Sequence, residues 1–166
     1  MERGELVPDI EFLAAYCAIV GLDLSLRAYP AGDAMRDGPQ QRLLERLRGR
    51  LHPGLRWRTE VPLPIPGDLR AWDAEIRGVV PTRWRSRVEA ETRVSDGQAL
   101  ERKLALKLRD DPEGHLILLL ADTRSNRAAI AALRPGLRAQ FPINARDLFA
   151  ALGAGREPPG NAIVLM

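Results

Sequence analysis

Two short stretches decide the fold of this chain: RAWDAEI, residues 70–76, and VEAETR, residues 88–93. Both alternate charged and apolar residues with a period of two, which is the pattern of a β-strand with one buried face. A turn signal at Pro81 separates them. The sequence therefore predicts two strands, about 71–79 and 83–94, paired as an antiparallel hairpin.

The same period assigns side chains to the two faces of the hairpin. The first strand turns Asp73 and Glu75 to one face, and Trp72, Ala74 and Ile76 to the other, towards a core. The second strand turns its acids at positions 89 and 91 to the face that carries the acids of the first. Four carboxylates are therefore expected on one side of two neighbouring strands.

A turn at Pro81 also predicts the register of the hairpin. The numbers of opposed residues then sum to about 162, which places Asp73 opposite Glu89 and Glu75 opposite Arg87. Directly opposed side chains have Cβ atoms only about 5 Å apart. Like charges at that distance are destabilising, so the pair of acids predicts a compensating cation.

Two kinds of cation fit this prediction. Arg87 and Arg93 could form a purely structural ion-pair network with the acids. Alternatively, Asp73, Glu89 and Glu91 could hold Mg²⁺, a hard ion that takes one or two carboxylates and retains several waters. The residues of the hairpin leave both interpretations open.

The helix expected at 96–110 carries two lysines that could lie near these acids. Of the 25 basic residues only Lys103 and Lys107 are lysine, and both fall inside the apolar arc of this helix. Lysine is rarely buried without a partner. The lysines therefore either extend along the helix edge to solvent or act beside the acids, where an ammonium orients water or stabilises negative charge.

The order of the predicted elements resembles the PD-(D/E)xK, or restriction-endonuclease-like, nuclease superfamily. That resemblance implies a helix, a three-stranded meander, a helix and a further strand. The corresponding segments here are 39–51, 55–61, 71–79, 83–94, 96–110 and 115–121. We accordingly expect a mixed α/β fold, with a single central mixed sheet flanked by helices.

The resemblance also implies roles for individual residues. The first acid of the family corresponds to Asp73, with Asp68 as the second choice, and the next acid corresponds to Glu89 of VEAET. Glu60, on the first core strand, resembles an extra acid of some members. Asp73 and Glu89 are thus the expected metal ligands, with Mg²⁺ as the implied ion and DNA as the implied partner.

The chain departs from the family pattern two residues after Glu89. Glu91 stands where the family has lysine, and it would assist as a metal ligand or general base. In some members the lysine has moved to the following helix, where Lys103 or Lys107 would take its place. Because family members that lose activity keep the fold, the resemblance is also compatible with a non-catalytic domain.

The N-terminal segment predicts a second feature of the protein. Residues 1–21 resemble the end of a Cro/repressor-type helix-turn-helix, and an ordinary amphipathic helix at 9–20 explains them equally well. Residues 22–166 would form the nuclease-like domain, with a first strand near 22–28. The alternative function is therefore a transcriptional-regulator domain that uses this fold to bind a partner or ligand.

Composition sets the remaining expectations. A net charge of +3 permits nucleic-acid binding without requiring it. No apolar run is long enough to span a bilayer, and no leader opens the sequence, so a cytoplasmic protein without a membrane partner is expected. RWRTE, residues 56–60, interleaves tryptophan with arginine, which suits nucleic-acid stacking, although alternation favours Trp57 as a core residue. A homodimer is compatible with all of these features.

Overall fold

The computed structural model describes residues 9–22, 24, 37–78, 83–137 and 139–166, in two units, Met1–Met35 and Arg36–Met166. The first unit contains helix α1, Ile10–Ile19. Its N-cap is Asp9, whose side chain accepts a hydrogen bond of 2.7 Å from the backbone N–H of Phe12. The strand expected near 22–28 lies almost entirely outside the described residues.

The second unit carries the remaining helices and all of the described strands. In chain order they are α2 (Asp37–Arg48), β1 (Arg56–Pro62), β2 (Ala71–Arg77), β3 (Arg85–Glu91), α3 (Gly97–Asp110), β4 (His115–Leu120), α4 (Arg124–Leu137), α5 (Ala145–Gly153) and β5 (Ala162–Leu165). None of the helices in the described ranges has the length and apolar character needed to cross a bilayer.

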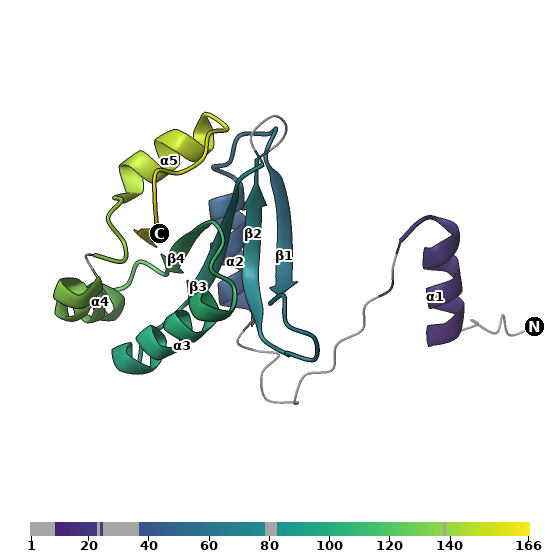
Figure 1. Ribbon diagram of the computed structural model, residues 1–166, viewed down its shortest axis with the longest axis horizontal. Helices are drawn as coiled ribbons and strands as arrows, with labels where there is room; N and C mark the ends of the chain where they lie inside the picture. Colours follow the sequence, from purple (N-terminus) through teal and green to yellow (C-terminus); the bar gives the residue numbers. More distant parts are fainter. Residues whose placement is uncertain (1–8, 23, 25–36, 79–82, 138) are drawn as a thin grey trace, which may run out of the picture. The chain divides into compact units, whose positions relative to one another are not determined.

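The five strands form one mixed sheet in the order β1-β2-β3-β4-β5. The first three are antiparallel neighbours, whereas β4 is parallel to β3 and β5 is parallel to β4. Parallel neighbours need a long crossover connection; α3 makes the first, and α4 with α5 makes the second (Figure 1). The predicted mixed α/β class, with one sheet flanked by helices, is confirmed.

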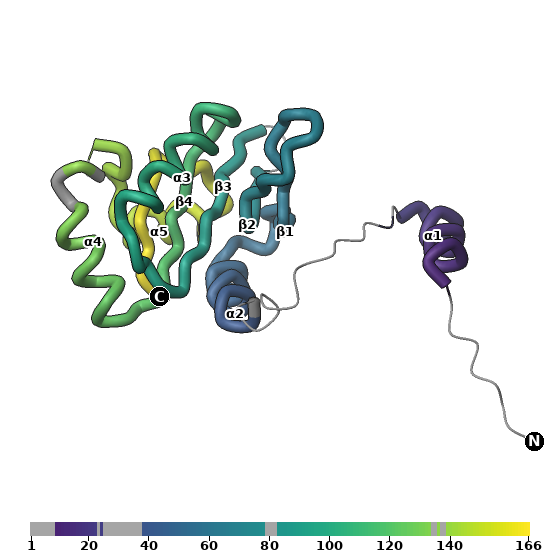
Figure 2. Tube along the Cα trace, turned by 90° about the horizontal axis from the view of Figure 1, so that it is seen from below, coloured from purple at the N-terminus to yellow at the C-terminus, as the bar shows by residue number. Residues whose placement is uncertain are grey.

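Helices cover both faces of this sheet. Leucines of α2 and α5 pack on one face against Ala74, Val88 and Ile117, and this set is called the α2-side core. Leucines of α3 pack on the other face against Leu116 and Leu118 in the α3-side core, which Ile130 and Leu133 of α4 also contact. Figure 2 shows α2 and α3 on opposite sides of the strands.

Two expectations about these elements are wrong. Trp72 was expected to share a face with Ala74 and Ile76, yet it packs in the α3-side core while they pack in the α2-side core. The strand therefore changes its facing pattern between Trp72 and Ala74. The stretch TRSNRAAIAALR, residues 123–134, is followed by Pro135-Gly136, which predicts that the helix stops there, but α4 continues to Leu137.

Candidate functional site

The candidate site lies where strands β2 and β3 separate. Their antiparallel pairing runs from Arg77–Arg85 to Ala74–Val88, so the expected sum of 162 is confirmed for these pairs. The pairing ends one position before Asp73 would oppose Glu89. Beyond that point the backbone of Ala90 is bound by side chains instead of by β2.

Ala90 is held on both of its main-chain groups. Its N–H donates a hydrogen bond of 2.7 Å to Oδ2 of Asp73. Its carbonyl accepts one of 3.0 Å from Nε2 of Gln40, near the start of α2. Buried backbone groups that lose a strand partner must find another, and here two side chains supply it. Asp73 is thereby fixed in the gap between the two strands.

Glu89 is buried beneath helix α3 and paired with both lysines. Lys103 Nζ lies 2.5 Å from its Oε1, and Lys107 Nζ lies 2.6 Å from its Oε2. Lys103 also reaches Oε1 of Glu91 at 2.8 Å. Lys107 is buried, donates to the carbonyl of Ala71 and lies over the ring of Trp72. The inward position expected for the two lysines is confirmed for Lys107, whereas Lys103 is 45% exposed and approaches from the helix edge.

The electrostatics of the site centre on Asp73. Burial, reinforced by the negative charge of Glu89, raises the pKa of Asp73 to about 6. The hydrogen bond from Ala90 and the ammonium groups of Lys107 and Lys103 oppose this rise without cancelling it. Burial on its own lowers the pKa of Lys103, but the neighbouring carboxylates of Glu89 and Glu91 more than reverse that effect and raise it. A carboxyl group with so perturbed a pKa, beside a cavity, is a functional-site candidate.

Glu60 on β1 has an unusual backbone conformation. Its φ is 49°, the only positive φ of a residue other than glycine in the described ranges. The pairing of β1 with β2 is recorded at Thr59–Ala74 and Val61–Trp72, and Glu60 and Asp73 fall between these pairs. Such left-handed conformations cost about 1–3 kcal/mol and gather at functional sites. The strained residue therefore coincides with the position opposite Asp73.

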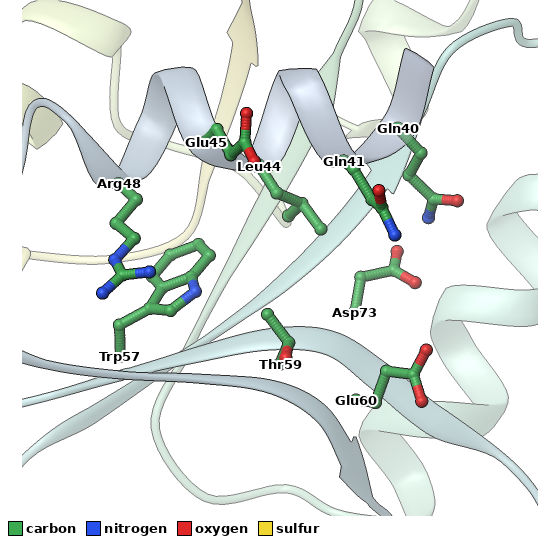
Figure 3. Close-up of a pocket in the computed structure, with 9 residues that line it drawn as sticks. All are labelled: Gln40, Gln41, Leu44, Glu45, Arg48, Trp57, Thr59, Glu60 and Asp73. Atoms are coloured by element: carbon green, nitrogen blue, oxygen red, sulfur yellow. The ribbon is translucent and has the colours of Figure 1, made fainter. Parts of the chain in front are cut away.

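A cavity of about 550 Å³ opens beside Asp73 on the α2 side. Its lining comes from α2, β1 and β2: Gln40, Gln41, Leu44, Glu45, Arg48, Trp57, Thr59, Glu60 and Asp73. Figure 3 shows Gln41 and Asp73 pointing toward each other at one end of it, and Arg48 with Trp57 at the other. Asp73 thus connects this cavity with the pairs formed by Glu89.

Arg87, one of the two arginines expected to neutralise the acids, has another partner. Arg87 opposes Glu75 in the register, as expected. Its guanidinium, however, pairs with Asp111 at 2.9 Å, and Glu75 pairs with Arg77 and Arg85. The prediction that Arg87 compensates Glu75 or the Asp73–Glu89 pair is therefore wrong, because Asp111 at the end of α3 binds it. Lysines provide the compensation for Glu89.

Asp68, the second choice for the first acid, lies outside the site. Its carboxylate pairs with Arg70, which also pairs with Asp110 at the end of α3. The Arg70 guanidinium lowers the pKa of Asp68, whereas that of Asp73 is raised. Of the two candidate acids, Asp73 alone lies beside Ala90 and the cavity.

The donor chemistry of the site fits a hard divalent cation. Asp73 and Glu89 offer carboxylate oxygens, and Mg²⁺ needs only one or two of these beside water and substrate phosphate. The part of the chain that the structure describes contains no group of three or more acidic, histidine or cysteine side chains placed to hold a metal. Glu89 would also have to exchange its contact with Lys103 for the ion. Comparison of the chain with protein-family models, with curated proteins and with solved structures finds no match.

Proposed function

We propose that the second unit is a nuclease-like domain that binds DNA and hydrolyses phosphodiester bonds with Mg²⁺. One observation carries the proposal: Asp73 fills the gap between β2 and β3 beside Glu89, and α3 adds two lysines there. The order of α2, three antiparallel strands, α3 and β4 supports it, because this is the order that the resemblance to PD-(D/E)xK nucleases implies.

Each side chain has a task in this proposal. Asp73 and Glu89 would hold the ion, which would neutralise charge on the phosphate and make a bound water more acidic. Glu91 has a side chain 27% exposed, so it can accept the proton of the attacking water. Lys107 keeps Glu89 in place from within the core. Lys103, at the helix edge, can leave Glu89 and stabilise the negative charge that develops on the phosphate.

The proposal is tested by cleavage of plasmid, duplex and single-stranded DNA with Mg²⁺ or Mn²⁺, with a chelator as the blank. We expect cleavage by the whole chain and a loss of at least about a hundredfold in Asp73→Ala, because the site loses one of the two carboxylates proposed to hold the ion. Asp68→Ala is the matched control. It removes a nearby aspartate that pairs with Arg70, so it should cleave like the unchanged protein.

Two results would contradict hydrolysis: no cleavage of any substrate, or equal cleavage by Asp73→Ala. One observation favours a second candidate function in that case. Both carboxylate oxygens of Glu89 already have a lysine partner, so the charge of Glu89 is compensated without a metal. The domain would then be a non-catalytic module of a transcriptional regulator that binds DNA or a ligand, and binding without cleavage would identify it.

A further inference from the structure

The cavity beside Asp73 combines an aromatic wall with polar and charged side chains. At about 550 Å³ it falls in the size range of pockets that hold small organic ligands. One wall is the ring of Trp57, the only one of the three tryptophans that lines it; Trp72 and Trp84 are buried in the cores. An aromatic wall of this kind offers a stacking surface to a planar ring.

Acidic side chains outnumber basic ones among the described residues that line the cavity. Carboxylates come from Glu45, Glu60 and Asp73, and Arg48 contributes a guanidinium within the same described lining. An anion would meet net repulsion there, whereas ring N–H and amino groups would meet acceptors. The expected occupant is therefore a neutral, planar group with hydrogen-bond donors on its edge.

The polar side chains allow more than one such group. The carboxamide of Gln41 and the hydroxyl of Thr59 both donate and accept hydrogen bonds, so they suit different donor and acceptor patterns. Gln40 is already engaged through its Nε2 with Ala90, which fixes this end of the cavity. Figure 3 shows Gln40 and Gln41 beside Asp73, and Thr59 between Asp73 and Trp57. The cavity has a stacking end and a hydrogen-bonding end.

From these features we infer that the cavity receives one unstacked nucleobase, placed against Trp57, while its phosphate stays outside the cavity, toward the ammonium group of Lys103. The inference rests on the proposed function and deepens it by naming the substrate class. Bases inside a duplex are paired and stacked, and they reach a pocket only when they are single-stranded or extruded. The preferred substrate is accordingly single-stranded or locally opened DNA.

The test is binding of a mixed-sequence 20-mer, single-stranded or as a duplex, in chelator so that no cleavage occurs. Intrinsic tryptophan fluorescence includes the emission of Trp57, and the part of the signal change that Trp57→Leu abolishes belongs to this residue. The single strand should quench it and bind more tightly than the duplex. Base–aromatic stacking implies that Trp57→Leu binds the single strand roughly five- to a hundredfold more weakly, with little change for the duplex.

A second variant protects the test against misfolding, since Trp57 also contacts the α2-side core. Gln41→Leu changes an exposed residue of α2 at the hydrogen-bonding end and should weaken single-strand binding several-fold. Gln98→Leu is its matched control, the same exchange at an exposed position of α3 outside the cavity, and should bind like the unchanged protein.

Each remaining outcome has a fixed meaning. Equal or tighter duplex binding, or unchanged affinity in both Trp57→Leu and Gln41→Leu, overturns the inference. If DNA is still cut in an Asp73-dependent manner, the proposed function survives that result. Free mononucleotides that bind as tightly as the 20-mer would support the nucleobase cavity and overturn a DNA strand as its source.

Discussion

Two clusters of buried charge lie on the α3 side of the sheet, and both touch Trp72. In the first, Asp111 binds Arg87 and Arg85, and it accepts a hydrogen bond of 2.9 Å from Nε1 of Trp72. In the second, Glu89 binds the two lysines. The clusters use the same chemistry at neighbouring positions, but the second lies beside Asp73, which lines the cavity on the α2 side.

The pKa of Asp111 beside the first cluster's arginines and the pKa of Asp73 beside the second cluster shift in opposite directions. Burial alone would raise the pKa of Asp111, but the hydrogen bonds of Arg87 and Trp72 lower it. Asp73 shows the reverse, because its partners do not offset burial and the charge of Glu89, and its pKa rises. A buried carboxylate whose charge is compensated by its hydrogen-bond and ion-pair partners serves the structure. A buried carboxylate whose charge is not fully compensated can still bind a ligand. By this difference, Asp111 belongs to the structural framework of the sheet and Asp73 to the candidate site.

The largest effect is expected from removing Asp111. Asp111→Ala leaves Arg87, which is fully buried, without its carboxylate, and should lower the free energy of unfolding by about 3–5 kcal/mol. The neighbouring Asp110→Ala is the control, because its partners Arg70 and Arg109 are 38% and 68% exposed, and it should lower the stability much less than Asp111→Ala. Urea denaturation measures both. Similar losses in the two variants would contradict the structural role of Asp111.

A smaller effect of opposite sign is expected at Asp73. The raised pKa means that the folded protein holds this proton up to about pH 6, whereas the unfolded chain loses it near the ordinary value of 3.8. Ionised Asp73 therefore costs stability above pH 6, and the cost disappears below about pH 4. In metal-free buffer Asp73→Asn should be more stable than the unchanged protein at pH 7.5, by on the order of 2–3 kcal/mol, and equal to it at pH 4. Denaturation curves at both pH values test this, and a variant less stable at pH 7.5 would refute it.

The smallest change in stability is expected at Lys103. Because its side chain is 45% exposed, Lys103→Gln should cost less than about 1 kcal/mol. The same change frees Oε1 of Glu89 and of Glu91, so calorimetry should show Mn²⁺ binding about tenfold tighter, or about 1.4 kcal/mol. Lys103→Arg retains the charge and serves as the control. Unchanged affinity in Lys103→Gln would show that this lysine does not compete with a cation.

Local patterns account for most of the fold and part of the site. A turn expected at Pro81, which lies outside the described residues, and a period of two predict the register that β2 and β3 adopt, and the helical period of α3 suffices to turn Lys107 inward. These features depend on neighbours in sequence. Strand alternation alone also places Glu89 and Glu91 on the side of α3.

The remainder depends on contacts between distant segments. Asp111 competes for Arg87 only once α3 has packed, so the hairpin alone suggests the wrong partner. Trp72 packs on the α3 side, where its indole N–H donates to Asp111, a partner far away in the sequence. The left-handed backbone of Glu60 breaks the ordinary preference of its residue type, and no sequence pattern signals it. Tryptophan between arginines in RWRTE was the one local sign of the cavity.

The way Ala90 is held has a consequence for how the protein tolerates change. Both contacts reach its main chain, so they do not depend on which side chain position 90 carries, provided that it fits a site only 2% exposed. The identities that matter belong to Asp73 and Gln40, on other elements. Position 90 can therefore exchange one small residue for another and keep both hydrogen bonds. Substitution of Gln40 or Asp73 would remove one of them. The side chains that hold this part of β3 therefore belong to other segments of the chain, and not to Ala90 itself.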